Sequence, residues 1–169
     1  MEPITWTFLG TLGGAVVGAV TSIATTTINS RNVASLQLVK VNDEREERRR
    51  TFQRETILEV QDCFYDLLRL ATRLYLADLI AFKASQNWGL SKIDADLDEG
   101  FRLQNQKLSC LLERIFDEDL RNQLRSLHRN VSSIATANSR EEAEAIDQSS
   151  SAEFRQTMTA LGAVLRSNY

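Results

Sequence analysis

The feature that most constrains this chain is its N-terminal stretch, because residues 3–30 contain no charged side chain although a quarter of all residues are charged. As a helix, Ile4 to Ile28 would extend roughly 37 Å at about 1.5 Å per residue, and the hydrocarbon core of a bilayer is about 30 Å thick. Trp6 near one end suits a membrane interface. A cleaved signal peptide would begin with basic residues, whereas Glu2 is acidic. We therefore predict a transmembrane helix over residues 1–30.

Basic residues flank this predicted span only on its C-terminal side. Arg31, Lys40 and Arg45 lie close behind it, and the run Arg48 to Arg50 follows within about 20 residues. By the positive-inside rule, we expect the N-terminus outside and residues 31–169 in the cytoplasm. The sequence thus predicts a single-pass protein of a bacterial inner membrane in contact with membrane lipid.

Small and hydroxyl-bearing residues share one face of the predicted span. At about 100° per residue they occupy an arc of roughly 140°. Small residues at intervals of four let helix backbones approach closely in lipid, so we predict a homo-oligomer. The predicted pore or helix-packing face consists of Thr7, Gly10, Thr11, Gly14, Gly18, Thr21, Ser22, Thr25 and Asn29.

Two interpretations of this face stay open. A dimerising anchor needs only a narrow strip of small residues, and such strips are common in membrane helices. In a ring of three or more copies, the same hydroxyl groups would instead line a narrow wet path. The width of the polar arc favours the pore, because a dimer contact occupies a narrower strip.

Residues 31–51 predict a charged helical stalk. Between Asn42 and Thr51 no residue is apolar, and most acidic residues precede the basic ones. Pairs such as Glu44 with Arg48 favour a solvated helix stabilised by its own ion pairs, each worth about 0.2 to 0.5 kcal/mol. In an oligomer, each residue would instead form a ring. We then expect an acidic collar that concentrates cations, made of Asp43, Glu44 and Glu47, and a basic collar that binds an anionic regulator, made of Arg48, Arg49, Arg50 and Arg54.

Residues 52–169 predict a cytoplasmic bundle of about four helices. Apolar residues recur at helical spacing from Phe52 to Ala84, and again from Leu120 to Ile134. The fold class is therefore all-α, with one transmembrane helix continuing into a stalk and a bundle. The predicted helix starts are Ser91 with Asp94, Asp117, Ser139 with Glu142, and Ser150 with Glu153.

The sequence offers no constellation for catalysis or metal binding. His128 is the only histidine, and we expect it at the surface or at the boundary of the core. Cys63 and Cys110 are far apart within apolar helical patterns, which favours free thiols that pack as small apolar groups. The acidic run from Asp94 to Asp98 lacks the glycine and the glutamate of a calcium loop. We predict neither an enzyme, nor a cofactor, nor a metal site.

A glycine-rich N-terminal span, an Arg/Glu stalk and a small helical body resemble the membrane effectors of bacterial anti-phage systems, specifically the membrane component of Hailong. The resemblance covers chiefly Trp6 to Arg54 and is architectural. It implies a tetrameric channel that a DNA oligonucleotide keeps shut, with a partner nucleotidyltransferase making that oligonucleotide. The run Arg48 to Arg50 would then be one candidate contact for it.

The leading hypothesis is a homo-oligomeric, pore-forming membrane protein, a gated ion channel or toxic effector regulated through its cytoplasmic helices. The alternative is a membrane-tethered helical adaptor that recruits a cytoplasmic partner to its bundle.

Overall fold

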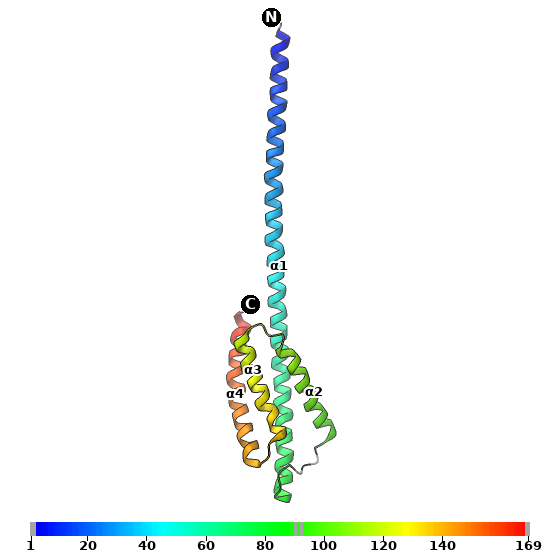
Figure 1. Cartoon of the computed structure of the whole chain (residues 1–169), viewed down its shortest axis with the longest axis vertical. Coiled ribbons are helices and arrows are strands. Elements are labelled where there is room, and N and C mark those ends of the chain that lie inside the picture. The colour runs from blue at the N-terminus through cyan, green and yellow to red at the C-terminus, as the bar shows by residue number, and fades with distance from the viewer. Residues whose placement is uncertain (1–2, 90, 92, 168–169) are drawn as a thin grey trace. The chain divides into compact units, whose positions relative to one another are not determined.

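The computed structural model describes residues 3–89, 91 and 93–167, and it leaves the side chains at 3–16, 19, 23–24 and 27–28 undescribed. Nearly all of the described chain is helical, which confirms the all-α prediction (Figure 1). Helix contacts divide the chain into two compact units, Met1–Arg48 and Arg49–Tyr169, and each is considered by itself below. The helices are α1 (Pro3–Ser85), α2 (Ala95–Leu112), α3 (Glu118–Ser133), the 3-10 helix η1 (Ile134–Thr136) and α4 (Arg140–Ser167).

The first unit consists of the part of α1 that ends at Arg48. Every described side chain from Val17 to Arg48 is exposed, the apolar ones included. Within the described residues, no helix has a stretch that is both long and apolar enough to cross a membrane. The side chains of Thr7, Gly10, Thr11 and Gly14 lie outside the described set, so the predicted span and its packing face stay predictions.

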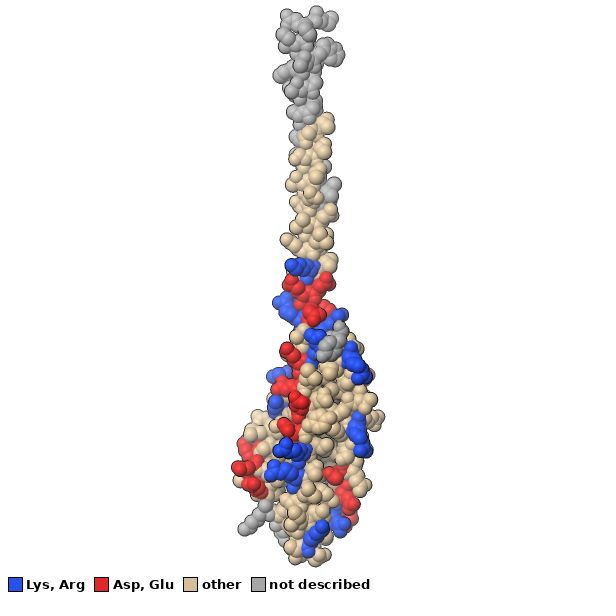
Figure 2. Space-filling view, turned by 180° about the vertical axis from the view of Figure 1, so that it is seen from behind, with Lys and Arg blue, Asp and Glu red and all other residues tan. Residues whose placement is uncertain are grey.

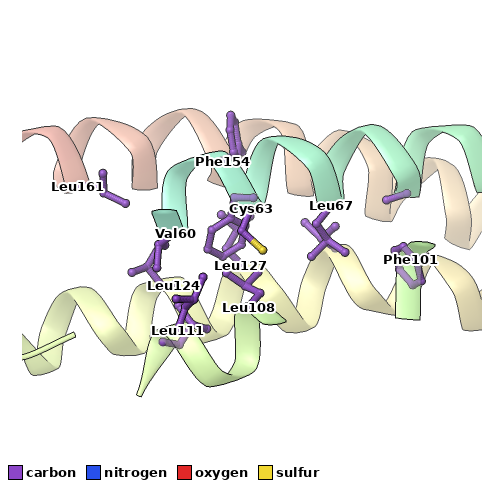
Figure 3. Close-up of a cluster of buried hydrophobic side chains, with 14 of the residues drawn as sticks. Val60, Cys63, Leu67, Phe101, Leu108, Leu111, Leu124, Leu127, Phe154 and Leu161 are labelled. Carbon is purple, nitrogen blue, oxygen red and sulfur yellow. The ribbon is translucent and has the colours of Figure 1, made fainter. Parts of the chain in front are cut away.

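The second unit is an up-and-down bundle in which α1 from Arg49 onward, α2, α3 and α4 run antiparallel to their neighbours in the sequence (Figure 1). Each helix buries one apolar stripe against the others, as amphipathic helices of a bundle do. Figure 3 shows Val60 and Leu67 of α1 facing Leu108 of α2 and Leu124 and Leu127 of α3. The helix α4 closes this core with Phe154 and Leu161.

Two of the predicted helix starts are confirmed. The Asp117 carboxylate accepts a hydrogen bond from the Leu120 N–H at 2.8 Å and caps α3. The Ser139 hydroxyl accepts from the Glu142 N–H at 3.1 Å and caps α4. Each cap satisfies one of the backbone donors that the first turn of a helix leaves open.

The other two predicted starts are wrong. The α2 helix begins after Asp94, whose carboxylate accepts from the Asp96 N–H at 3.2 Å, while the Ser91 hydroxyl donates to Asp78 instead. Ser150 lies in the interior of α4 and is 2 % exposed. The apolar stripe of α4 continues through this position, and burial of the whole stripe outweighs a local capping pattern.

Candidate functional site

The described residues of the predicted packing face are exposed along α1. Gly18, Thr21, Ser22, Thr25 and Asn29 are all exposed, and their spacing of three or four residues places them on one side of the helix. A Cβ added at Gly18 would meet no atom within 4 Å. A side chain at position 18 would therefore point into open space on this protomer, where a neighbouring molecule could contact it.

The threonine hydroxyls on and beside this face donate to their own helix. Thr21 donates to the Val17 carbonyl and Thr25 to the Thr21 carbonyl, both at 2.8 Å. Thr26, beside the face, donates to the Ser22 carbonyl at the same distance. Such bonds to the preceding turn leave no unpaired O–H, while each oxygen can still accept another hydrogen bond. The face therefore tolerates both apolar surroundings and water.

The predicted acidic collar residues are exposed on α1. Asp43 and Glu47 are one turn apart on one side of the helix, while Glu44 is turned by about 100° from Asp43. The Arg48 side chain donates through Nε to the Glu44 backbone carbonyl at 3.1 Å, although an ion pair with the Glu44 carboxylate was expected. On the face that Figure 2 shows, this part of α1 carries a band of mixed charge.

The four arginines of the predicted anion site make separate local contacts. The Arg49 guanidinium lies over the Phe116 ring, 4.8 Å from its centroid, and Arg54 donates to the Thr51 hydroxyl at 3.1 Å. Arg48, Arg49 and Arg50 follow one another at about 100° around the helix, so they face three directions. In one protomer the basic run is therefore not a ready-made anion pocket, and the regulator site stays a prediction.

A glutamine that the sequence analysis did not single out holds the bundle together at this end. Gln53 is 6 % exposed and contacts the α2–α3 loop through both ends of its side-chain amide. Its Nε2 donates to the Arg114 carbonyl at 2.8 Å, and its Oε1 accepts from the Phe116 N–H at 3.0 Å. Phe52 adds a ring contact to Phe116, with centroids 6.2 Å apart. The start of the bundle part of α1 is thereby fixed to the α2–α3 loop.

A small polar cluster lies between α2 and α3. The Asn105 side chain carbonyl contacts His128 Nε2 at 2.9 Å and accepts from the Ser132 hydroxyl, while its amide nitrogen donates to the Phe101 carbonyl. Partial burial lowers the pKa of His128 below its usual value. His128 is thus a boundary histidine with a structural partner, as predicted.

The two thiols have opposite surroundings. Cys63 is buried and donates to the Gln104 side-chain carbonyl at 3.1 Å, and burial raises its pKa to about 11. Cys110 is exposed on α2, which corrects the expectation that both thiols pack as small apolar groups. The apolar stripe of α2 runs along the other side of that helix.

We expect a thiol reagent such as 5,5′-dithiobis(2-nitrobenzoate) to modify Cys110 quickly and to spare Cys63. With a pKa of about 11, only roughly one Cys63 side chain in a thousand is a thiolate at pH 8. The native protein should therefore release one equivalent of thionitrobenzoate in the fast phase, and urea should expose the second. A Cys110→Ser variant should lose the fast phase, and two fast equivalents in the native protein would contradict the burial of Cys63.

Among the described residues, no three histidine, cysteine, aspartate or glutamate side chains are grouped so as to hold a metal ion. Comparisons of the chain with protein-family models, with curated proteins and with solved structures found no match. The function is therefore argued from the residues alone.

Proposed function

We propose that this protein is a homo-oligomeric, pore-forming membrane protein, whose N-terminal helices line the pore and whose bundle assembles and regulates it. The observation that carries this proposal is the exposure of large apolar side chains all around the first unit of α1. Val17 and Leu36 are 67 % and 68 % exposed, and Val20, Val33, Leu38, Val39 and Val41 are also open. Exposed apolar surface of this extent is covered by lipid or by protein in the functional state.

The hydroxyl pattern supports the same proposal. Because Thr21 and Thr25 donate to their own helix, neither leaves an unpaired O–H in lipid or in a dry helix contact. Their oxygens remain acceptors and can replace part of the hydration shell of a passing cation. Gly18, about one turn before Thr21, leaves room for a neighbouring backbone.

The acidic residues beyond this face support cation conduction. Asp43 and Glu47 lie on the same side of α1 as Asn29, as their helical spacing requires. Repeated in each copy, they would form a ring of negative charge that raises the local cation concentration. We therefore expect cation selectivity, with a tetramer as the favoured assembly. An antiviral role, with a nucleotidyltransferase partner and an oligonucleotide regulator, belongs to this proposal through the resemblance alone.

The direct test is ion flux from proteoliposomes. Full-length protein reconstituted at increasing protein-to-lipid ratio should release entrapped K⁺ with a rate that rises more steeply than linearly, because several copies must meet. Asp43→Asn with Glu47→Gln should reduce K⁺ over Cl⁻ selectivity without changing the amount of inserted protein.

Two outcomes would contradict the proposal. Removal of the protein from membranes by alkaline carbonate would exclude an integral span. Stable insertion with no flux at any ratio would leave the membrane-tethered adaptor as the better account, and a detergent-corrected mass of two copies would favour that account over a pore.

A further inference from the structure

The bundle exposes apolar side chains on the outer face of α1, opposite its buried stripe. Leu58 and Leu76 are 45 % and 47 % exposed on this side. Tyr65 is 52 % exposed there, although its ring also packs edge-on against Phe154 of α4, with centroids 5.0 Å apart. On the other side, Val60 and Leu67 are fully buried. A solvated helix face of a monomer normally carries polar residues at such positions.

Charged residues share this outer face in a fixed order. Asp62 and Asp66 come first along α1, and Arg69 and Arg73 follow one turn later. All four are exposed, and no ion pair of any of them is present among the described residues. In Figure 2 a column of acidic side chains runs along the bundle and is followed by a basic group. The face therefore presents charged side chains that have no ion pair within the described part of the chain, beside the exposed apolar surface of Leu58 and Leu76.

The outer face of α2 also carries apolar and charged residues, and their order complements the order on the outer face of α1. Leu103 is 49 % exposed and Cys110 is exposed, and both lie away from the buried residues of α2. Also on α2, Arg102 and Glu99 form an exposed ion pair, in which Arg102 Nη2 lies 2.7 Å from Glu99 Oε1. On α2, Arg102 and Glu99 thus lie side by side near the apolar residue Leu103. On α1, Asp66 and Arg69 lie near Tyr65 in the same way.

The heights of these residues along the bundle also match. Cys63 contacts Gln104, and Gly100 lies against Leu70, which fixes the antiparallel register of α1 and α2. Counted from the Cys63–Gln104 contact, the following pairs lie within about 2 Å of equal height at about 1.5 Å per residue. They are Leu58 with Cys110, Tyr65 with Leu103, Asp66 with Arg102, and Arg69 with Glu99.

We propose that the outer face of α1 in one protomer packs against the outer face of α2 in the next, so that a second copy of this chain is the partner. This inference rests on the proposed function, because copies inserted in the same direction in one membrane are related by rotation without an axial shift. In an assembly whose bundles run along this rotation axis, residues at equal height meet, and here apolar meets apolar and acid meets base. Such a head-to-tail contact closes into a ring.

One like-charged pair occurs at the end of this contact, where Glu55 would approach Glu113. The Glu113 carboxylate is already paired with Arg125 at 2.6 Å, and the hydrogen bond from Arg125 lowers the pKa of Glu113. The contact therefore has compensated charge along its length.

The test uses the native Cys110. We expect Leu58→Cys in the full-length protein to give, after mild oxidation in membranes, a ladder of covalent species at multiples of 19.1 kDa, with three or more copies. Two different cysteines per protomer can link a chain of copies, whereas a single cysteine can link only two. Leu58→Cys with Cys110→Ser should therefore give no ladder, because position 58 then faces no thiol, and Gln156→Cys on α4 with native Cys110 should give none either.

Charge exchange provides a second measurement. Arg69→Glu should reduce the cross-linked fraction at least fivefold, and adding Glu99→Arg should restore it, while Arg129→Glu on α3 should change nothing. Failure of Leu58→Cys to link more than two copies would overturn the ring contact. An antiparallel pairing of two α1 faces would instead link Leu58→Cys to Leu76→Cys in a Cys110→Ser background.

The outcomes also separate this contact from the proposed function. A ladder without ion flux would support the ring and contradict the pore. Flux without a ladder would support the pore and show that the copies meet through other surfaces.

Discussion

Replacing Gly18 by leucine should reduce ion flux from proteoliposomes at least tenfold. Apart from its chain neighbours and the backbone of its own helix, a Cβ at this position meets no atom within 4 Å, so the substitution opens into free space on one copy. Leucine is also a better helix former than glycine, which costs a helix about 0.8 to 1 kcal/mol relative to alanine, so α1 itself should not weaken. The loss would come from neighbouring helices, whose close approach at a small residue the leucine prevents.

Val20→Leu is the matched control for this variant. Val20 is also exposed on α1, but it lies about 160° around the helix from Gly18 at about 100° per residue. Its flux and its detergent-corrected mass should equal those of the wild type. If Gly18→Leu conducts as well as Val20→Leu, the small-residue face is not where the helices meet.

Replacing Gln53 by leucine should lower the free energy of unfolding of the bundle by about 2 kcal/mol. The leucine would leave the Arg114 carbonyl and the Phe116 N–H without their side-chain partner, and an unsatisfied buried group costs about 1 to 3 kcal/mol. The measurement is urea unfolding of the full chain in detergent, followed by circular dichroism. Amide exchange at Phe116 should accelerate in the same variant.

Gln123→Leu on α3 is the control, because Gln123 is exposed and the substitution has the same chemistry. We expect a change within about 0.5 kcal/mol for such a surface position. Equal stability of the two variants would show that the Gln53 contact with the α2–α3 loop contributes little to holding the bundle.

The helices that the sequence predicted best are those whose apolar spacing and cap agree. In α3, Leu120, Leu124, Leu127 and Val131 are buried, and the predicted cap at Asp117 is present. In α4 the local capping pattern at Ser150 conflicted with the apolar stripe, and the stripe prevailed. Local patterns therefore predicted helix positions only where burial supported them.

The contacts that organise the bundle were harder to predict, because they join residues far apart in the sequence. Gln53 lies 61 and 63 residues from its two backbone partners, and nothing near it in the sequence indicates either. The outer face of α1, in contrast, can be recognised from the spacing of apolar residues in the sequence. Leu58 and Tyr65 are apolar at positions out of phase with the buried stripe, which is what a second contact surface requires.

The order in which the core is closed has a consequence for synthesis of the chain. The buried stripe of α1 reaches Leu74, but Phe154 and Leu161 of α4 complete the cover over that core. At 5 to 20 residues per second, translation from Leu74 to Leu161 takes roughly 4 to 17 s. During that interval α2 and α3 are made, but the core over α1 still lacks the part of its cover that α4 supplies. We therefore expect a transiently exposed apolar surface on the nascent chain, of the kind that chaperones bind.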